Sequence, residues 1–253
     1  MSTRAPAVVS PTSLAAHARR RYFRPEMRFC APGGTSDGGR RRGGLAVAAL
    51  TLLTTAIGGG CRAKDAVIAS PFVDAFERND LGADWRDTGG QYSVAHGKLL
   101  ARNGYNHPAW LRRRLPRDVT VELDVQSNST AGDIKVELFG DGASFDPDRG
   151  GYVSTGYVFI FGGWRNSLSV ICRNNEHDEG RKAMRTDRRV EVGRSYHFTI
   201  TRKGGHIDWL VDGQPFLAWT DPQPLAGAGH EYFAINDWEA EVSFDNLAIR
   251  PAP

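Results

Sequence analysis

The chain has 253 residues, 24% of them charged, and a formal net charge of +3. Residues 1–64 contain eleven Lys or Arg and two acidic residues, which leaves 21 basic and 27 acidic residues, a net charge near −6, from residue 65 onward. The later part therefore lacks the basic surface that binding to nucleic acid requires, and we expect no nucleic-acid partner.

The first 39 residues show no sign of a domain, because they are rich in Arg, Ala, Pro, Ser and Gly without periodicity. They indicate a disordered leader or an over-extended start, with the true start at Met27. Residues 40–61 combine three arginines, a 13-residue apolar run from Leu45 to Ile57 and a Gly-Gly-Gly-Cys end. Because a membrane-spanning helix needs roughly 20 residues, this pattern predicts a signal peptide, followed by a linker over residues 62–71.

The signal ends in IGGGC, which resembles the lipobox of bacterial secreted lipoproteins. Cleavage before the cysteine would make Cys61 the lipidated residue. Gly58 stands where that motif usually has Leu, so ordinary signal-peptide cleavage between Ala56 and Ala63 is the alternative. We expect an exported protein that meets a membrane only through its lipid anchor, at the cell envelope or cell surface, or otherwise a periplasmic or secreted one.

Cys172 is the single cysteine beyond that point, so the body of the chain has no intrachain disulfide. It alternates with Leu168 and Val170. We therefore expect it to point inward as a small hydrophobic residue and not to act as a catalytic thiol.

Residues 72–253 show the two-residue alternation of β-strands, with turns rich in Gly, Asp and Asn. Asp212-Gly213 predicts a hairpin, and EYFAIND and EAEVSFDNLAI are the last predicted strands. No helical period extends beyond about two turns, so we expect an all-β fold of two antiparallel sheets sharing one core. The predicted inward positions are Val119, Val121, Leu123, Val125, Ile134, Val136, Leu138, Tyr157, Phe159, Phe161, Tyr196, Phe198 and Ile200.

Several of these segments resemble the concanavalin A-like lectin/glucanase (laminin-G-like) jelly-roll superfamily. FVDAFERNDLGADW and YSVAHGKLLA resemble the opening of those domains, and YHFTITRKGGHIDWLVDG and VSFDNLAI resemble later strands, as found in bacterial surface lipoproteins. The resemblance covers roughly Phe72 to Pro251. It implies a jelly-roll sandwich whose concave sheet often binds or cleaves carbohydrate.

The glucanases of that superfamily carry E-x-D-x-x-E or E-x-D-x-E on one strand. Glu122 and Asp124 share one face of a predicted strand, but Gln126 and Ser127 follow where the second glutamate would stand. Glu137, on the next strand, is a candidate partner if the register allows it. Retaining glycosidases need two carboxyl groups about 5 Å apart. Otherwise these carboxylates form the solvated face of an antiparallel sheet.

The segment from Phe161 to Arg181 is a stronger candidate site, because sugar sites pair a flat aromatic ring with a few fixed hydrogen-bonding groups. Its candidate ligand-binding residues are Trp164, Asn166, Arg173, Asn174, Glu176 and His177. Further platforms are predicted at Tyr105, His107, Trp110 and Trp238. The alternative is that the tryptophans pack in the core, as we expect for Trp85 and Trp209, and that the charged residues are solvated.

Related glucanases hold a structural calcium ion through main-chain oxygens and an aspartate of the terminal strand. The resemblance implies Asp245 for this aspartate, with the carbonyl groups of Asp74 and Gly97 as partners. Asp245 could instead turn the chain by accepting hydrogen bonds from nearby N–H groups. We expect no other cofactor.

These features favour a non-catalytic carbohydrate-binding domain that holds a polysaccharide on a concave sheet. A glycoside hydrolase of the same fold is the first alternative. A structural or adhesion domain with protein partners is the second.

Overall fold

The computed structural model describes residues 64–89, 91–144 and 154–253. The predicted leader, signal peptide and lipidation residue Cys61 lie outside these residues. Among the described residues, no helix is long and apolar enough to cross a membrane.

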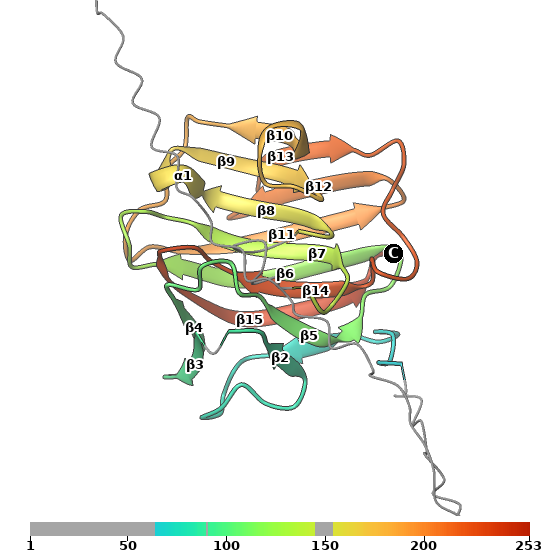
Figure 1. Ribbon diagram of the computed structural model, residues 1–253, viewed down its shortest axis with the longest axis horizontal. Helices are drawn as coiled ribbons and strands as arrows, with labels where there is room; N and C mark the ends of the chain where they lie inside the picture. Colours follow the sequence, from blue (N-terminus) through green and yellow to red (C-terminus); the bar gives the residue numbers. More distant parts are fainter. Residues whose placement is uncertain (1–63, 90, 145–153) are drawn as a thin grey trace, which may run out of the picture. The chain divides into compact units, whose positions relative to one another are not determined.

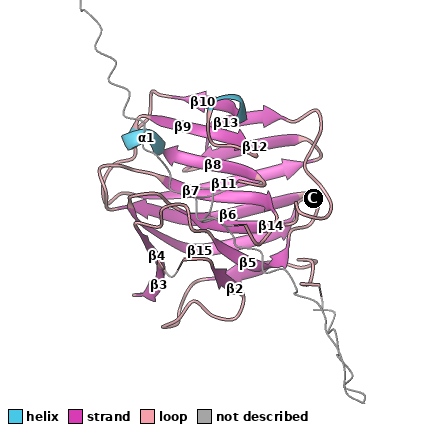
Figure 2. Ribbon diagram, viewed as in Figure 1, coloured by secondary structure: helices cyan, strands magenta, loops and turns pink. Residues whose placement is uncertain are grey.

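The regular secondary structure of the described chain is nearly all strand (Figure 2). Besides the short segments α1 (Gly163–Asn166) and η2 (Asp178–Gly180), it forms β1 (Phe72–Asp74), β2 (Trp85–Asp87), β3 (Tyr92–Ala95), β4 (Lys98–Arg102), β5 (Ala109–Arg114), β6 (Val119–Ser127), β7 (Ile134–Gly140), β8 (Tyr157–Gly162), β9 (Leu168–Arg173), β10 (Arg181–Arg185), β11 (Ser195–Lys203), β12 (His206–Val211), β13 (Gln214–Thr220), β14 (Tyr232–Asn236) and β15 (Glu241–Pro251).

Two antiparallel sheets form a sandwich, as predicted (Figure 1). The eight-stranded sheet has the order β13-β12-β11-β6-β15-β4-β3, and β1 also pairs with β15. The seven-stranded sheet has the order β10-β9-β8-β7-β14-β5-β2. The predicted hairpin joins β12 to β13, with a positive φ of 54° at Asp212 and 71° at Gly213, as a tight two-residue turn requires.

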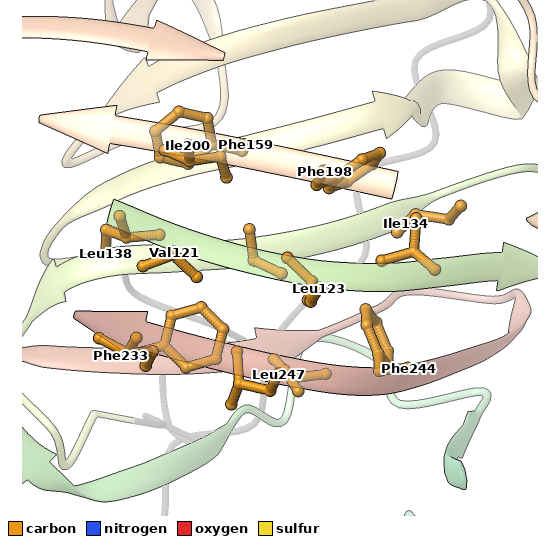
Figure 3. Packing of buried hydrophobic residues seen from close by; sticks show 14 of the residues in the cluster. Val121, Leu123, Ile134, Leu138, Phe159, Phe198, Ile200, Phe233, Phe244 and Leu247 are labelled. Atoms are coloured by element: carbon orange, nitrogen blue, oxygen red, sulfur yellow. The ribbon is translucent and has the colours of Figure 1, made fainter. Parts of the chain in front are cut away.

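The core fills the space between the sheets with the apolar side chains of alternating strand positions. Figure 3 shows residues from both layers packed together, among them Val121 and Phe198 from one sheet and Ile134 and Phe159 from the other. All the predicted inward positions belong to this core. Trp209 is also buried, as expected, with four phenylalanine rings at centroid distances of 4.8–6.4 Å.

The outer face of the seven-stranded sheet carries a second, smaller apolar cluster of Val158, Ile160, Val170 and Cys172. The register pairs Val158 with Cys172 and Ile160 with Val170, while the intervening Phe159 belongs to the main core. Cys172 is buried, but the prediction that it points into the core is wrong. Alternation with Val170 shows that the two share a face, but not which of the two faces it is. Burial raises the pKa of the thiol to about 12.

The same outer face holds Lys135 and Glu137 of β7, both buried. Alternation predicts their outward direction, but loops cover them. Glu137 Oε1 accepts a 3.0 Å hydrogen bond from the N–H of Thr155, and Lys135 Nζ contacts two further loops. This covered outer face positions the site described below.

The sandwich begins before the predicted boundary at residue 72. Ile68 is buried in the main core, and its N–H donates to the carbonyl of Arg114 at 2.9 Å. At least this part of the predicted linker therefore belongs to the folded domain. The sequence of residues 62–71 lacks alternation, which is why the linker prediction extended too far.

Candidate functional site

A cavity of about 580 Å³ opens on the outer face of the seven-stranded sheet. Lys135 of β7 and Ile160 of β8 lie at its floor. One wall rises beside β8 and β9 and includes Trp164 and His177. The second wall follows β14 and includes Trp238. Because β7 lies between β8 and β14 in the sheet, the two walls flank the floor.

The first wall depends on a left-handed turn at α1. Trp164 and Arg165 have φ/ψ angles of 49°/57° and 59°/47°, and Asn166 has φ 60°. Left-handed backbone costs about 1–2 kcal/mol per non-glycine residue. Such a run persists only where its surroundings hold it, and strain of this kind clusters at ligand-binding sites.

Asn166 fixes this turn. Its Oδ1 accepts a hydrogen bond from the N–H of Val190, and its Nδ2 donates to the carbonyl of Val190, both at 2.8 Å. Ser167 Oγ donates to the carbonyl of Trp164 at 2.7 Å. Since the Asn166 amide is buried and occupied, the prediction that it contacts ligand is corrected: it positions Trp164.

Trp164 stands at the cavity between two neighbouring groups. The His177 ring meets it edge-on, with centroids 5.8 Å apart and planes at 82°. The guanidinium of Arg181 lies 4.2 Å from its ring centroid, a cation–π contact. Trp164, Glu176 and His177, all predicted from one segment, therefore do meet at one cavity.

The floor is a buried, hydrogen-bonded charge pair. Lys135 Nζ lies 3.0 and 3.1 Å from the two carboxylate oxygens of Glu176 and 2.6 Å from Asn106 Oδ1. Burial opposes the charged form of Lys135, but the carboxylates of Glu176 and Asp133 outweigh it and raise the pKa of Lys135. The floor is therefore an ammonium, a carboxylate and an amide fixed in one network, which can donate to and accept from hydroxyl groups.

The second wall consists of Tyr105 and Trp238, whose rings pack edge to face at 5.2 Å and are 46% and 40% exposed. Their loops are tied together, because Tyr105 N–H donates to the Trp238 carbonyl and Asn106 N–H to the Asp237 carbonyl, both at 2.9 Å. Trp238 N–H also donates to Asp133 Oδ2 at 2.6 Å. Trp238 lines the cavity and Tyr105 supports it.

A buried carboxyl group holds the base of this wall. Both oxygens of Asp237 accept the N–H of Gly104, at 3.1 and 3.2 Å. Burial raises the pKa of Asp237 to about 7, with a further contribution from the charge of Asp133. This group therefore titrates near neutral pH directly behind Trp238.

Three predicted platform residues are not among those that line the cavity: Tyr105, which packs against Trp238, and Trp110 and His107. Trp110 is fully buried, and a Cβ at Gly140 would lie 2.4 Å from its ring, so the backbone of β7 covers it and it cannot stack on a ligand. His107 holds its own loop, with Nδ1 3.2 Å from the carbonyl of Thr88 and its own carbonyl accepting the Tyr92 hydroxyl at 2.8 Å. All three predictions are corrected, because a loop sequence does not show which aromatic ring turns inward.

Arg173 and Asn174 are also outside the residues that line the cavity. Arg173 Nε donates to Asp221 Oδ2 at 2.8 Å, and the Tyr157 hydroxyl donates to the same oxygen at 2.7 Å. Asn174 has φ 57° and donates its N–H to Gly156 at 2.9 Å, which turns the chain after β9. Their roles in this structure are structural, and their prediction as ligand contacts is corrected.

The three candidate catalytic carboxyl groups do not form a pair across one groove. Glu122 and Asp124 belong to β6 of the eight-stranded sheet, whereas Glu137 belongs to β7 of the other sheet. The register that would bring Glu137 beside them is therefore absent between these described strands. The hydrogen bond from Arg250 lowers the pKa of Glu122. Burial raises the pKa of Glu137 to about 8, but its side chain is fully enclosed.

The residues implied for calcium lie along one edge of β15. Asp74 of β1 pairs with Leu247 of β15. The strand β4 begins directly after Gly97 and pairs with β15 as far as Phe244. Asp245 therefore lies between the part of β15 that pairs with β4 and the part that pairs with β1. Within the described ranges, no three His, Cys, Asp or Glu side chains are grouped as a metal site would require. The calcium site stays a prediction, which thermal unfolding with calcium and with a chelator would test.

Sequence reasoning missed several residues that line the cavity, namely Ala131, Asp133, Lys135, Ile160 and Glu239. Lys135 left one usable signal, since it is the one cation of β7 and is buried on its outer face beside Glu137. The others carry no signal in the sequence, because segments far apart in the chain, the strand β8 among them, bring them together.

Comparison with known proteins gives one family match. Residues 145–247, less than half of the chain, match the family described as "Farnesoic acid 0-methyl transferase". Among curated proteins, no match to the chain is found.

Solved structures are similar to the chain over most of its length. A carbohydrate binding module, CBM66, from Bacillus subtilis has a TM-score of 0.54 and 14% identity, covering 68% of this chain and 98% of that chain. A Bacillus subtilis protein of unknown function with a galectin-like fold has a TM-score of 0.54 and 16% identity, covering 72% and 96%. A prokaryotic β-1,3-1,4-glucanase (lichenase) from a mouse hindgut metagenome has a TM-score of 0.50 and 13% identity, covering 72% and 100%. The fold is therefore a two-sheet jelly-roll sandwich.

Proposed function

We propose that the cavity on the seven-stranded sheet binds carbohydrate without cleaving it. The observation that carries this proposal is the position of Trp164 and Trp238 on two walls that flank the polar floor of Lys135, Glu176 and Asn106. A sugar ring has an apolar face that stacks on an aromatic ring and a rim of hydroxyl groups that bonds to fixed polar groups.

The similar structures support this proposal at the level of fold. Their names include a carbohydrate binding module, a lichenase and a laminarinase. A fold hosts many functions, so the argument rests on the cavity itself. Four residues that the sequence predicted as ligand contacts, Trp164, Glu176, His177 and Trp238, line it together.

A glycoside hydrolase is the second candidate, because Asp133, Glu176 and Glu239 also line the cavity. Such enzymes need one carboxyl group that keeps its proton and one that is ionised. Lys135 holds Glu176 in a charge pair, and Asp133 accepts the N–H of Trp238, so both carboxyl groups already have partners within the protein. This is why binding without cleavage is the function that we place first.

The test is to incubate the domain with a panel of polysaccharides and to measure retention and newly released reducing ends together. We expect retention without cleavage, and Trp164→Ala should weaken affinity by about tenfold or more. Met184→Ala, an exposed apolar residue of β10 outside the cavity lining, is the control and should bind normally. Released ends would favour the hydrolase. A folded sample that neither binds nor cleaves any glycan would favour a structural or adhesion domain.

We also propose that the protein is exported and anchored through Cys61. The support is the apolar run and IGGGC end of the sequence alone. Incorporation of labelled fatty acid, abolished by Cys61→Ser, would support the anchor. Recovery of unlabelled protein in the soluble fraction would contradict it.

A further inference from the structure

The wall that carries Trp164 is cationic and lacks carboxylate partners among the described residues. Arg165 lines the cavity and is exposed. Arg181 stacks on Trp164 and donates from Nε to the carbonyl of Glu176 at 3.2 Å. Arg189 donates from Nη1 to the carbonyl of Asn166. These groups therefore gather around the left-handed turn while none of them is neutralised by an acid.

Most other arginines of the described chain form ion pairs. Arg78, Arg114 and Arg250, for example, pair with Asp74, Glu231 and Glu122. The part of the chain from residue 65 onward is acidic overall. Arg86 and Arg112, which line a second pocket, also lack an ion pair among the described residues, but at this wall the unpaired guanidinium groups lie beside an aromatic ring that lines the cavity. Guanidinium recognises carboxylate, sulfate and phosphate oxygens through two parallel hydrogen bonds.

The second wall has the opposite charge. Glu239 lines the cavity there, next to Trp238. Asp133 lies between the two walls, because its N–H donates to the carbonyl of Gly162 at 2.9 Å and its Oδ2 accepts the N–H of Trp238 at 2.6 Å. At the floor, Glu176 is neutralised by Lys135. The cavity therefore has guanidinium groups on the Trp164 side, Glu239 on the Trp238 side and Asp133 between them. A ligand with one anionic group would be oriented by this arrangement, with that group beside Arg165.

We propose that the glycan held in this cavity is anionic, and that its carboxylate or sulfate group binds beside Arg165 on the cationic wall. This inference rests on the carbohydrate-binding function proposed above. A uronic acid offers a carboxylate and a sulfated sugar offers a sulfate group, and a guanidinium binds the oxygens of both in the same way. The experiment distinguishes these two kinds of glycan. Glu239 on the second wall would repel an anionic group placed in the opposite orientation.

The experiment compares matched polymers at low and high salt by calorimetry. One pair is polygalacturonate and the same polymer with its carboxylates reduced to alcohols. The other is a sulfated galactan and its desulfated form. We expect at least one anionic polymer to bind about tenfold more tightly than its neutral partner, with a preference that shrinks as salt screens the charges. The pair that shows the preference identifies the anionic group.

Arg165→Gln should abolish most of that preference, measured as the ratio of the variant's affinities for the anionic polymer and its neutral partner. Arg117→Gln, an exposed arginine outside the cavity lining, is the matched control and should keep the preference. Neutral polymers that bind as tightly as anionic ones, or an unchanged preference in Arg165→Gln, would overturn the inference while the binding function stands. Absence of binding to any glycan, with no effect of Trp164→Ala, would overturn the binding function itself.

Discussion

Asp237 links the stability of the second wall to pH. Burial raises its pKa to about 7 in the folded chain, against 3.8 for the unperturbed group. Between these values the folded state binds the proton more tightly than the unfolded state. The stability that this carboxyl contributes is therefore fully present below about pH 4 and is lost as the pH rises through 7. Glu137, with a pKa of about 8, contributes with the same sign.

We predict that Asp237→Asn flattens this pH dependence. The loss in free energy of unfolding between about pH 5 and about pH 8 should shrink by on the order of 2–3 kcal/mol, because an amide does not titrate. Urea unfolding at several pH values measures it, and Asp80→Asn, an exposed carboxylate, is the control. Asp74 and Asp221 do not interfere, since their hydrogen-bond partners lower their pKa and their effect falls at more acidic pH. An unchanged slope in Asp237→Asn would contradict the assignment.

At the scale of one element, the α1 turn places Trp164 at the cavity, and Asn166 holds it with two hydrogen bonds to Val190. We predict that Asn166→Gly lowers the free energy of unfolding by about 1–3 kcal/mol through the lost bonds. Asn166→Ala should cost roughly 1 kcal/mol more, because alanine also strains at φ 60°. Both should weaken glycan binding, since Trp164 is no longer fixed.

Denaturant unfolding of the two variants measures their order of stability, and calorimetry measures their affinity for the glycan. Both variants lose the two hydrogen bonds, but glycine adopts the left-handed backbone without strain. The difference between their free energies of unfolding therefore measures the strain alone. Equal stability of Asn166→Ala and the unaltered protein would show that the turn does not depend on Asn166.

The strands could be predicted because their alternation is a local property. In β6, β7, β8 and β11 the residues that face the core are the ones that the two-residue period selects. Whether loops cover the opposite face of the sheet does not depend on the sequence of the strand itself. Lys135 and Glu137 alternate as solvent-facing residues would, yet loops from elsewhere in the chain bury them. The period therefore shows which side chains share a face of the sheet, but not what covers that face.

The site could be predicted in part for the same reason. Trp164, Glu176 and His177 lie within one short segment whose composition suits a sugar ring, so the sequence could single it out. The ring of Trp110 is equally suited to stacking on a sugar, but β5 places it against Gly140 of β7, where the backbone covers it. Asp133 and Lys135 join the cavity only because β7 runs between β8 and β14, an order that local patterns do not contain.

At the scale of the molecule, the sandwich separates stability from binding. The main core lies between the sheets, whereas the cavity lies on the outer face of one of them. Residues of the core therefore determine how much of the protein is folded, and residues of the loops determine what the folded protein binds.

This separation makes a prediction about Phe198, which is fully buried and packs against Trp209 at 5.2 Å and Phe161 at 5.7 Å. Phe198→Ala should lower the free energy of unfolding by about 3–5 kcal/mol, because it removes a ring and leaves a cavity. Its folded fraction should bind glycan within about twofold of the unaltered protein, since the two sites share no partner. Trp164→Ala should do the reverse, losing affinity with little change in unfolding. Calorimetry measures the affinity of both variants, and urea unfolding measures their stability. A large loss of affinity in folded Phe198→Ala would contradict the prediction. It would show that the core and the cavity are coupled through β8, which carries both Phe161 and Ile160.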